Sequence, residues 1–550
     1  MNTIKRAVLS ANNLRGIKRG LLLLAGALAF ALPFITKSMA ADTSFCKVFC
    51  IFGWIGLSVL FVTVFDFEKS LKRVLCSLFC FFFLFYFFVY SWFINLYPLD
   101  FAGLGNAESV GVIIIAETVI PFLHGVLMSA GVFLGYLAAK QTKNDFARAA
   151  LVSFGYVIGE YLQSVGVFAF PWARLFVGQT VFPSLLQSAS LFGSYFITFI
   201  MVLVNALLAF SLVNVKDKNK KCIVYVAAAV CIFAFNLVFG IVRINYADCH
   251  KGRTLDALVL QGNIPSGEKW SGDVDEESIY FELAKTANDG KFDIAVMPET
   301  AFPVTLYHDD GYLSSHEDTL VEISKTLDAV LFAGAFSKQD GKSYNSIFAI
   351  KPDGEILPPY NKYNIVPFGE FLPYRNIIEK LVPSLAEINM LSSDISRGNT
   401  FDPIETNAGK AACLVCFDSI FPETARKQIK NGGEFIVIST NDSWYKESSA
   451  IYQHADHAII RAIENNVPVI RSANTGISRI IDSCGRVVAE TKVNERANIQ
   501  AKVCIPKVKT IYTVTGDIIV PAAFVLVFFF LAYGIITHKN TSRKQREVRK

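Results

Sequence analysis

Cysteine and histidine are scarce in this sequence, which has 11 and 7 of them in 550 residues. Eleven cysteines scattered over this length are too few for a disulfide framework. Six of them lie in or beside apolar runs, where cysteine usually packs as a small hydrophobic side chain: Cys46, Cys50, Cys76, Cys80, Cys222 and Cys231. Two pairs have i, i+4 spacing, but no histidine or further cysteine accompanies them, so no metal site is predicted.

An excess of charge of one sign is also missing. Lys and Arg total 52 and Asp and Glu total 47, which leaves a formal net charge of +5. No basic patch interleaved with aromatic residues appears outside the loops between apolar runs, so the sequence gives no case for a nucleic-acid partner. Internal repeats and low-complexity segments are not visible either.

Apolar residues are abundant instead, at 53% of the chain, and Phe alone contributes 48 residues. Soluble proteins hold about 45–50%, so the excess predicts membrane spans of about 20 residues. Eight stretches fit, at 20–36, 45–66, 74–97, 112–136, 149–168, 189–213, 222–243 and 517–537. The polar region between the last two is long enough for one large core. We therefore predict a seven-helix bundle at 1–250, a folded domain at 251–510, and a last helix with a basic tail at 511–550.

Basic residues cluster in alternate loops and so orient the bundle. They lie within 5–19, 69–73, 140–148, 216–221 and 539–550. The intervening loops hold only Lys37 and Arg174. By the positive-inside rule, both termini are predicted in the cytoplasm. Seven spans precede the polar domain, so that domain is predicted on the outer face.

The first apolar segment has a second interpretation. Residues 1–41 resemble a cleaved signal peptide, with a basic start, an apolar stretch at 21–35 and the residues Ser38, Met39 and Ala40 after it. The other seven spans already make this a multi-span protein, so we prefer a retained helix. Cleavage would leave seven spans and the domain on the same side.

Within the polar region, short β-like runs alternate with helical patterns, which is typical of an α/β domain. The predicted strands are 255–261, 294–297, 330–335, 346–350, 411–416, 435–439 and 467–472. The predicted helices are 275–288, 318–328, 421–431 and 451–466. In the membrane half, the aromatic and weakly polar segment 166–188 predicts an interfacial or re-entrant structure on the outer face.

Glu299 ends the first of three apolar runs that finish in a reactive side chain, within MPETAFP at 297–303. A carboxylate held in a dry site at the end of a buried strand suits a general base. The alternative is a strand-end carboxylate that caps the next turn.

Lys362 belongs to the second run, YNKYNIVPFGEFLP at 360–373, which also holds Glu370. An ammonium group among aromatic and apolar residues is well placed to stabilise a developing oxyanion. A salt-bridged surface loop is the alternative, but two prolines and four aromatic residues in this run are unlike a plain solvated loop.

Cys416 closes the third run, AACLVCFDSIFPE at 411–423, and precedes a helical pattern. A helix N-terminus and a nearby lysine both favour the thiolate, which is the nucleophilic form. A lone strand-end cysteine is more often structural, but the Glu299 and Lys362 segments favour a nucleophile here. Cys413 lies three residues away, and strand alternation predicts it on the opposite face, in packing.

The order and spacing of Glu299, Lys362 and Cys416 resemble the Glu-Lys-Cys triad of the nitrilase superfamily. Four further motifs resemble its apolipoprotein N-acyltransferase branch: QGNIP at 261–265 with Trp270 downstream, VPFGE at 366–370, NDSW at 441–444 and RSANTG at 471–476. In the membrane half, Gly159-Glu160 followed by Phe170-Pro171-Trp172 is similar to that family's fifth span and the loop after it.

The resemblance implies a polytopic α-helical membrane bundle with an inserted nitrilase-like αββα sandwich on the periplasmic face of a bacterial inner membrane. It implies transfer of a fatty acyl group from a phospholipid, through a cysteine thioester, to the N-terminal amine of a diacylated apolipoprotein. The implied kinetics are ping-pong, and no metal or cofactor is implied. Supporting or substrate-binding roles would fall to Glu370, Trp270, Asn345, Asp418, Trp444 and Glu160.

One departure from the family and two alternative functions remain open. The family usually has Cys-Tyr-Glu at the nucleophile, whereas this chain has Cys416-Phe417-Asp418, which leaves the role of Asp418 undefined. A membrane-tethered amidase or nitrilase would transfer the acyl group to water, but one anchor would suffice for it. A transporter or scaffold with a degenerate domain is the other alternative. Glu117, His124 and Glu160 favour it weakly, because charged groups in spans often mark pathways.

Overall fold

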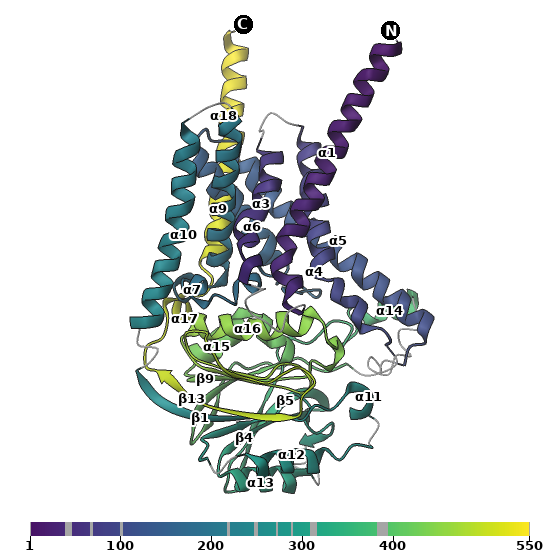
Figure 1. Ribbon diagram of the computed structural model, residues 1–550, viewed down its shortest axis with the longest axis vertical. Helices are drawn as coiled ribbons and strands as arrows, with labels where there is room; N and C mark the ends of the chain where they lie inside the picture. The colour runs from purple at the N-terminus through teal and green to yellow at the C-terminus, as the bar shows by residue number, and fades with distance from the viewer. Residues whose placement is uncertain are drawn as a thin grey trace.

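The computed structural model describes residues 2–38, 47–65, 70–99, 103–216, 220–246, 251–270, 273–287, 290–307, 316–381 and 394–548. A bundle of long helices forms one half of the molecule and an α/β domain the other (Figure 1). Both chain ends lie at the far end of the bundle from the domain. The predicted cleavage-site residues Met39 and Ala40 fall outside the described residues.

Eight long helices make up the bundle: α1 (Asn2–Ile35), α3 (Ile51–Val64), α4 (Leu71–Val89), α5 (Asn106–Ala139), α6 (Asp145–Leu162), α9 (Ser194–Lys216), α10 (Lys221–Tyr246) and α18 (Ile519–Val548). Seven described helices are long and apolar enough to cross a membrane. They cover seven of the eight predicted spans.

Helix α6 is the exception, because the predicted span 149–168 becomes a helix of 18 residues that carries Asp145, Arg148 and Glu160. It does not need an apolar surface all round, since much of it is buried inside the bundle. A Cβ added at Gly131 of α5 would lie 2.4 Å from the backbone nitrogen of Gly159. Small residues therefore bring the backbones of α5 and α6 into close contact, as in other membrane helix pairs.

The α/β domain is built on two sheets packed face to face. One has the strand order β13-β1-β2-β4-β5-β6, with β3 beside β4, and the other has the order β12-β11-β10-β9-β8-β7. The strands of the first are β1 (Gly252–Gln261), β2 (Ile294–Val296), β3 (Thr305–Tyr307), β4 (Val330–Gln339), β5 (Lys342–Ile350), β6 (Ile356–Asn361) and β13 (Ala497–Pro506). Those of the second are β7 (Ile404–Thr406), β8 (Gly409–Val415), β9 (Phe435–Thr440), β10 (Val469–Ala473), β11 (Arg479–Ile481) and β12 (Val487–Glu490).

Helices cover the outer face of each sheet and complete an αββα sandwich (Figure 1). α12 (Glu276–Thr286) and α13 (His316–Leu327) pack on the first sheet. α15 (Pro422–Lys430) and α16 (Ser449–Asn465) pack on the second sheet and lie between it and the bundle. Their core is continuous with the buried core of the bundle, so the domain rests directly on the membrane helices.

All seven predicted strands and all four predicted helices of the domain are present, with small shifts at their ends. The strand predicted at 411–416 ends at Val415, one residue before Cys416. Six strands were not predicted, namely β3, β6, β7, β11, β12 and β13. Three of these have only three residues, too few for a period-2 pattern to be recognised.

The segment 166–188 is mostly irregular and largely buried, with short turns at η4 (Leu175–Gln179) and α7 (Pro183–Leu186). It contacts α16 directly, since Trp172 Nε1 donates to Gln453 Oε1 at 2.9 Å. The imidazole of His457, also on α16, lies 3.0 Å from the Trp172 carbonyl oxygen. The segment therefore joins the bundle to the domain.

Candidate active site

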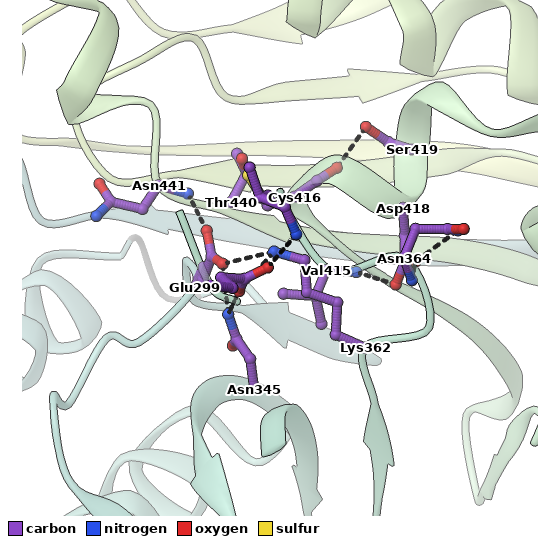
Figure 2. Close-up of polar contacts among 12 residues, drawn as sticks. Glu299, Asn345, Lys362, Asn364, Val415, Cys416, Asp418, Ser419, Thr440 and Asn441 are labelled. Carbon is purple, nitrogen blue, oxygen red and sulfur yellow. Dashed lines mark hydrogen bonds and ion pairs between the residues drawn. The ribbon is translucent and has the colours of Figure 1, made fainter. Parts of the chain in front are cut away.

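Glu299, Lys362 and Cys416 each follow the end of a strand, and the fold brings all three together between the two sheets (Figure 2). Glu299 follows β2, Lys362 follows β6, and Cys416 follows β8. Their exposed fractions are 7%, 1% and 8%. The three side chains that the sequence selected from segments more than fifty residues apart thus share one nearly dry site.

Hydrogen bonds fix the Glu299 carboxylate on both oxygens. Oε1 accepts from Asn345 Nδ2 at 2.7 Å and lies 3.4 Å from Lys362 Nζ. Oε2 accepts from the backbone N–H of Asn441 at 2.8 Å. Because donors from three separate elements converge on it, the carboxylate is oriented before substrate arrives, as a general base should be.

Lys362 is held between two carboxylates. Its Nζ lies 2.9 Å from Glu370 Oε1 and 3.4 Å from Glu299 Oε1. Asn345 bridges the same two acids, since its Nδ2 also donates to Glu370 Oε1 at 2.9 Å. Burial alone would lower the pKa of Lys362, but the charges of Glu370 and Glu299 outweigh it and hold that pKa above its usual value. The ammonium group therefore stays charged and can stabilise an oxyanion.

Cys416 has a left-handed backbone, with φ +48°, an unusual conformation for a residue other than glycine. Such conformations cluster at functional sites. Burial and the Glu299 charge raise the pKa of the Cys416 thiol, and Lys362 opposes them only in part. The sequence analysis expected an environment that favours the thiolate; here burial prevails, so the resting side chain is a thiol that needs a base.

Cys413 is fully buried in the core between the two sheets, the same core that Cys416 borders. The predicted opposite facing is wrong, because strand alternation stops at Val415 and the backbone turns at Cys416. Both cysteines are therefore near the inter-sheet space, but Cys413 lies within packed apolar side chains.

Asp418, whose role the sequence left open, connects the Lys362 segment to the turn at Cys416. Its carboxylate accepts from the Asn364 backbone N–H at 2.7 Å and from the Tyr360 hydroxyl at 2.9 Å. It also accepts from the Val415 backbone N–H at 3.3 Å. Burial raises the pKa of Asp418, and these donors oppose the rise. The side chain positions the two segments that carry Lys362 and Cys416 (Figure 2).

The two tryptophans that the resemblance selected are both partly exposed. Trp270 is 45% exposed at the end of α11 (Ser266–Lys269), and Trp444 is half-buried in η9 (Ser443–Tyr445). Next to Trp270, Lys269 is 1% exposed, and its Nζ donates to the Glu299 backbone oxygen at 3.0 Å. Burial lowers the pKa of Lys269 to about 8. The sequence analysis did not select Lys269, whose hydrogen bond supports the backbone at Glu299.

Glu160 is buried in α6 and faces the segment that joins the bundle to the domain. Its Oε1 accepts from the Leu175 backbone N–H at 3.1 Å, and its Oε2 accepts from Thr198 Oγ1 at 2.7 Å. Arg174 Nη2 lies 3.4 Å from Oε2. These contacts fall just after Phe170-Pro171-Trp172, so Glu160 holds the start of η4.

The other two groups singled out in the spans, Glu117 and His124, are buried. His124 Nδ1 lies 2.9 Å from the Tyr90 hydroxyl. Both carboxylate oxygens of Glu117 are buried with no hydrogen-bond partner in the described part of the chain. Among the described residues, no group of three or more His, Cys, Asp or Glu side chains is arranged to hold a metal ion.

Three residues near Cys416 were not selected as site residues by the sequence analysis: Asp442, His454 and Arg471. Two of these residues lie in the NDSW and RSANTG motifs, which did mark the region. His454 carried no signal, because a histidine in an amphipathic helix is indistinguishable from a packed one without the tertiary structure.

Comparison with known proteins places this chain in a family. Residues 21–207 match the apolipoprotein N-acyltransferase N-terminal domain and residues 261–511 match the carbon-nitrogen hydrolase domain. An apolipoprotein N-acyltransferase of Geobacter metallireducens is 33% identical over 368 residues, which is 65% of this chain and 69% of that protein. One from Gloeobacter violaceus is 27% identical over 452 residues, 80% of this chain and 82% of that protein.

Among solved structures, Saccharomyces cerevisiae Nit3, a member of branch 10 of the nitrilase superfamily, is similar at 17% identity. That match covers 46% of this chain and 90% of that one, with a TM-score of 0.36. The two domain matches and the relatives at about 30% identity show which family the chain belongs to. The chain belongs to the apolipoprotein N-acyltransferase family, and it is a multi-pass membrane acyltransferase that acts on lipoproteins.

Proposed function

We propose that the enzyme takes its acyl group from a phospholipid, carries it as a thioester on Cys416, and passes it to the N-terminal amine of a diacylglyceryl-cysteine. The observation that carries this proposal is the convergence of Glu299, Lys362 and Cys416 in one buried site. The continuous core between the domain and the bundle supports it further, because both substrates are lipids.

In the first half-reaction, Glu299 takes the proton of the Cys416 thiol, and the sulfur attacks the ester carbonyl carbon of the phospholipid. Lys362 stabilises the resulting oxyanion together with the backbone N–H of Phe417. That N–H lies in the first turn of η8 (Cys416–Ile420), where backbone donors have no partner within the helix. The carbon–oxygen bond then breaks, Glu299 returns the proton to the leaving oxygen, and lysophospholipid departs.

In the second half-reaction, the acceptor amine attacks the thioester carbonyl and gives a proton to Glu299. The carbon–sulfur bond breaks, an amide forms, and Glu299 returns the proton to the Cys416 sulfur. A covalent intermediate between two substrates predicts ping-pong kinetics.

Trapping the acyl-enzyme tests this directly. The purified enzyme in detergent would be incubated with a phospholipid of defined chain length and no acceptor, then digested and mapped by mass spectrometry. We expect one acyl chain, held as a hydroxylamine-sensitive thioester, on the peptide that contains Cys416. Acyl transfer to an added diacylated lipopeptide, without a modified Cys416 at any time, would contradict the thioester.

We also propose that the domain faces the periplasm, as the loop charges predict. Both termini lie at the opposite end of the bundle from the domain, which supports an even number of crossings (Figure 1). Lys37, at the end of the first helical segment, pairs with the buried Asp456 of α16. That contact supports a retained first helix, because cleavage after residue 40 would release it.

A phosphatase that is active only in the periplasm tests the orientation. Fused after residue 505, it should be active, and fused after residue 550 it should be silent, because the basic tail is held in the cytoplasm. A cytoplasm-active reporter at the same two positions is the control and should give the opposite pattern. Activity of the phosphatase at residue 550 alone would reverse the proposed orientation.

Glu160 is proposed to shape the lipid entrance through the segment that it holds. If so, Glu160→Ala should slow acylation of Cys416 by phospholipid but spare amine transfer from acyl-enzyme already formed. Single-turnover assays separate the two steps. Thr198→Val is a matched control, because it removes one contact to Glu160 and keeps the carboxylate in place. Equal slowing of both steps, or of neither, would contradict the lipid-entry role.

A further inference from the structure

His454 lies directly behind the nucleophile turn. It belongs to α16, is fully buried, and its Nε2 lies 3.3 Å from the Cys416 carbonyl oxygen and 3.2 Å from Ser419 Oγ. Ser419 Oγ donates to the same carbonyl oxygen at 2.7 Å. Two side chains therefore hold the carbonyl group of the residue whose backbone is left-handed.

The other ring nitrogen of His454 contacts Asp442, which itself pairs with Arg471. Its Nδ1 lies 2.8 Å from Asp442 Oδ1, and Asp442 Oδ2 accepts from Arg471 Nη2 at 2.6 Å. Burial opposes ionisation of Asp442, but Arg471 and His454 lower the pKa of this carboxyl to about 2. A carboxylate oxygen and a carbonyl oxygen can only accept, so the contacts at Nδ1 and Nε2 are hydrogen bonds only when each of these nitrogens carries a hydrogen and donates. Contacts at both nitrogens therefore set the orientation of the ring.

A residue from the segment that joins the bundle to the domain packs on the face of the His454 ring. Trp172 stacks on His454 with centroids 5.1 Å apart and planes at 25°. The Trp172 indole is itself anchored by Gln453, one residue before His454 on α16. The segment that joins bundle and domain therefore packs against the group that supports Cys416.

The geometry of the trans peptide links the position of the Cys416 carbonyl to the direction of the Phe417 N–H. In a trans peptide the C=O and the following N–H point in opposite directions. Holding the Cys416 carbonyl on the His454 side therefore aims the Phe417 N–H the other way. We propose that His454, fixed by Asp442, Arg471 and Trp172, is a positioning residue that aims the Phe417 N–H at the oxyanion. This inference rests on the proposed thioester mechanism.

Two reactions of the same sulfur test the proposal. Alkylation of Cys416 by iodoacetamide needs a deprotonated thiol but forms no oxyanion, whereas acylation by a fluorescent phospholipid does. In His454→Leu we expect single-turnover acylation to fall about 10²-fold, as for loss of one oxyanion donor. We expect the alkylation rate to stay within about threefold of wild type. A role in general packing would slow both reactions together.

Three further variants keep the test informative if His454→Leu folds poorly. Ser419→Ala removes the second donor to the same carbonyl and should slow acylation about 10-fold without slowing alkylation. His454→Gln can still donate to the carbonyl and should recover part of the acylation rate. His457→Leu is the matched control, since His457 is equally buried one turn along α16 and contacts the Trp172 carbonyl.

The outcomes distinguish failure of the positioning role of His454 from failure of the proposed thioester mechanism. Wild-type acylation rates in both Ser419→Ala and His454→Gln would overturn the positioning role, as would equal loss of acylation and alkylation in these variants. Absence of any acyl group on Cys416 in the wild-type enzyme would instead contradict the proposed function itself.

Discussion

The Cys416→Ala variant should lose acyl transfer, whereas Cys413→Ala should keep most of it. Cys416 is the only group proposed to bond to the acyl chain, so its loss should lower the rate about 10⁴-fold or more, as for removal of other catalytic nucleophiles. Cys413 is fully buried in the inter-sheet core, and its replacement removes one sulfur atom from packed apolar surroundings. We expect that change to cost about 1 kcal/mol of stability and little activity.

The measurement is transfer of a labelled acyl chain from phospholipid to a diacylated lipopeptide in detergent. Melting temperatures of both variants show whether the fold survives, and Cys413→Ala controls for removal of a buried thiol from the same segment. Acyl transfer by Cys416→Ala at more than about 1% of the wild-type rate would contradict the nucleophile assignment.

Lys362→Met and Glu299→Gln should be the next most damaging changes. Methionine keeps the length and apolar bulk of Lys362 but removes the charge that stabilises the oxyanion, so thioester formation should fall about 10²-fold or more. Glutamine keeps the shape of Glu299 but cannot take a proton. Because both half-reactions need that proton, Glu299→Gln should be at least as slow in acylation and should also be slow in amine transfer.

Single-turnover acylation, followed by addition of the amine to preformed acyl-enzyme, measures the two steps separately. Glu370→Gln offers a control for Lys362, because it removes one of the two carboxylates that hold the ammonium group and leaves the lysine in place. We expect its loss to be smaller than that of Lys362→Met. An unchanged acylation rate in Lys362→Met would remove the lysine from the oxyanion site.

The membrane helices and most domain strands were predictable because their signals are local. A span is a run of about 20 apolar residues and a strand is a run with period 2, so each can be recognised within its own segment. The prediction of helices and strands was less complete where a strand is short or where a helix is buried within the bundle. The three-residue strands carry too little pattern, and α6 has three charged residues, of which Glu160 is buried within the bundle.

The candidate residues of the triad could also be selected from the sequence, because a reactive side chain at the end of an apolar run is visible there. The sequence by itself determined the candidate groups Glu299, Lys362 and Cys416. It also determined that the chain has a bundle of membrane helices. The common location of the three groups depends on the order of strands in two sheets, in which β2, β6 and β8 end near one another although they are far apart in the chain.

Only the tertiary structure decided how those groups are held. Asp418 became a positioning residue because the chain returns past it at Tyr360 and Asn364. His454 became a support for Cys416 because α16 crosses behind the nucleophile turn, with Trp172 of the bundle against its ring. Each of these contacts joins segments that are not adjacent in sequence, and a local pattern of residues carries no information about which distant segment will pack against it.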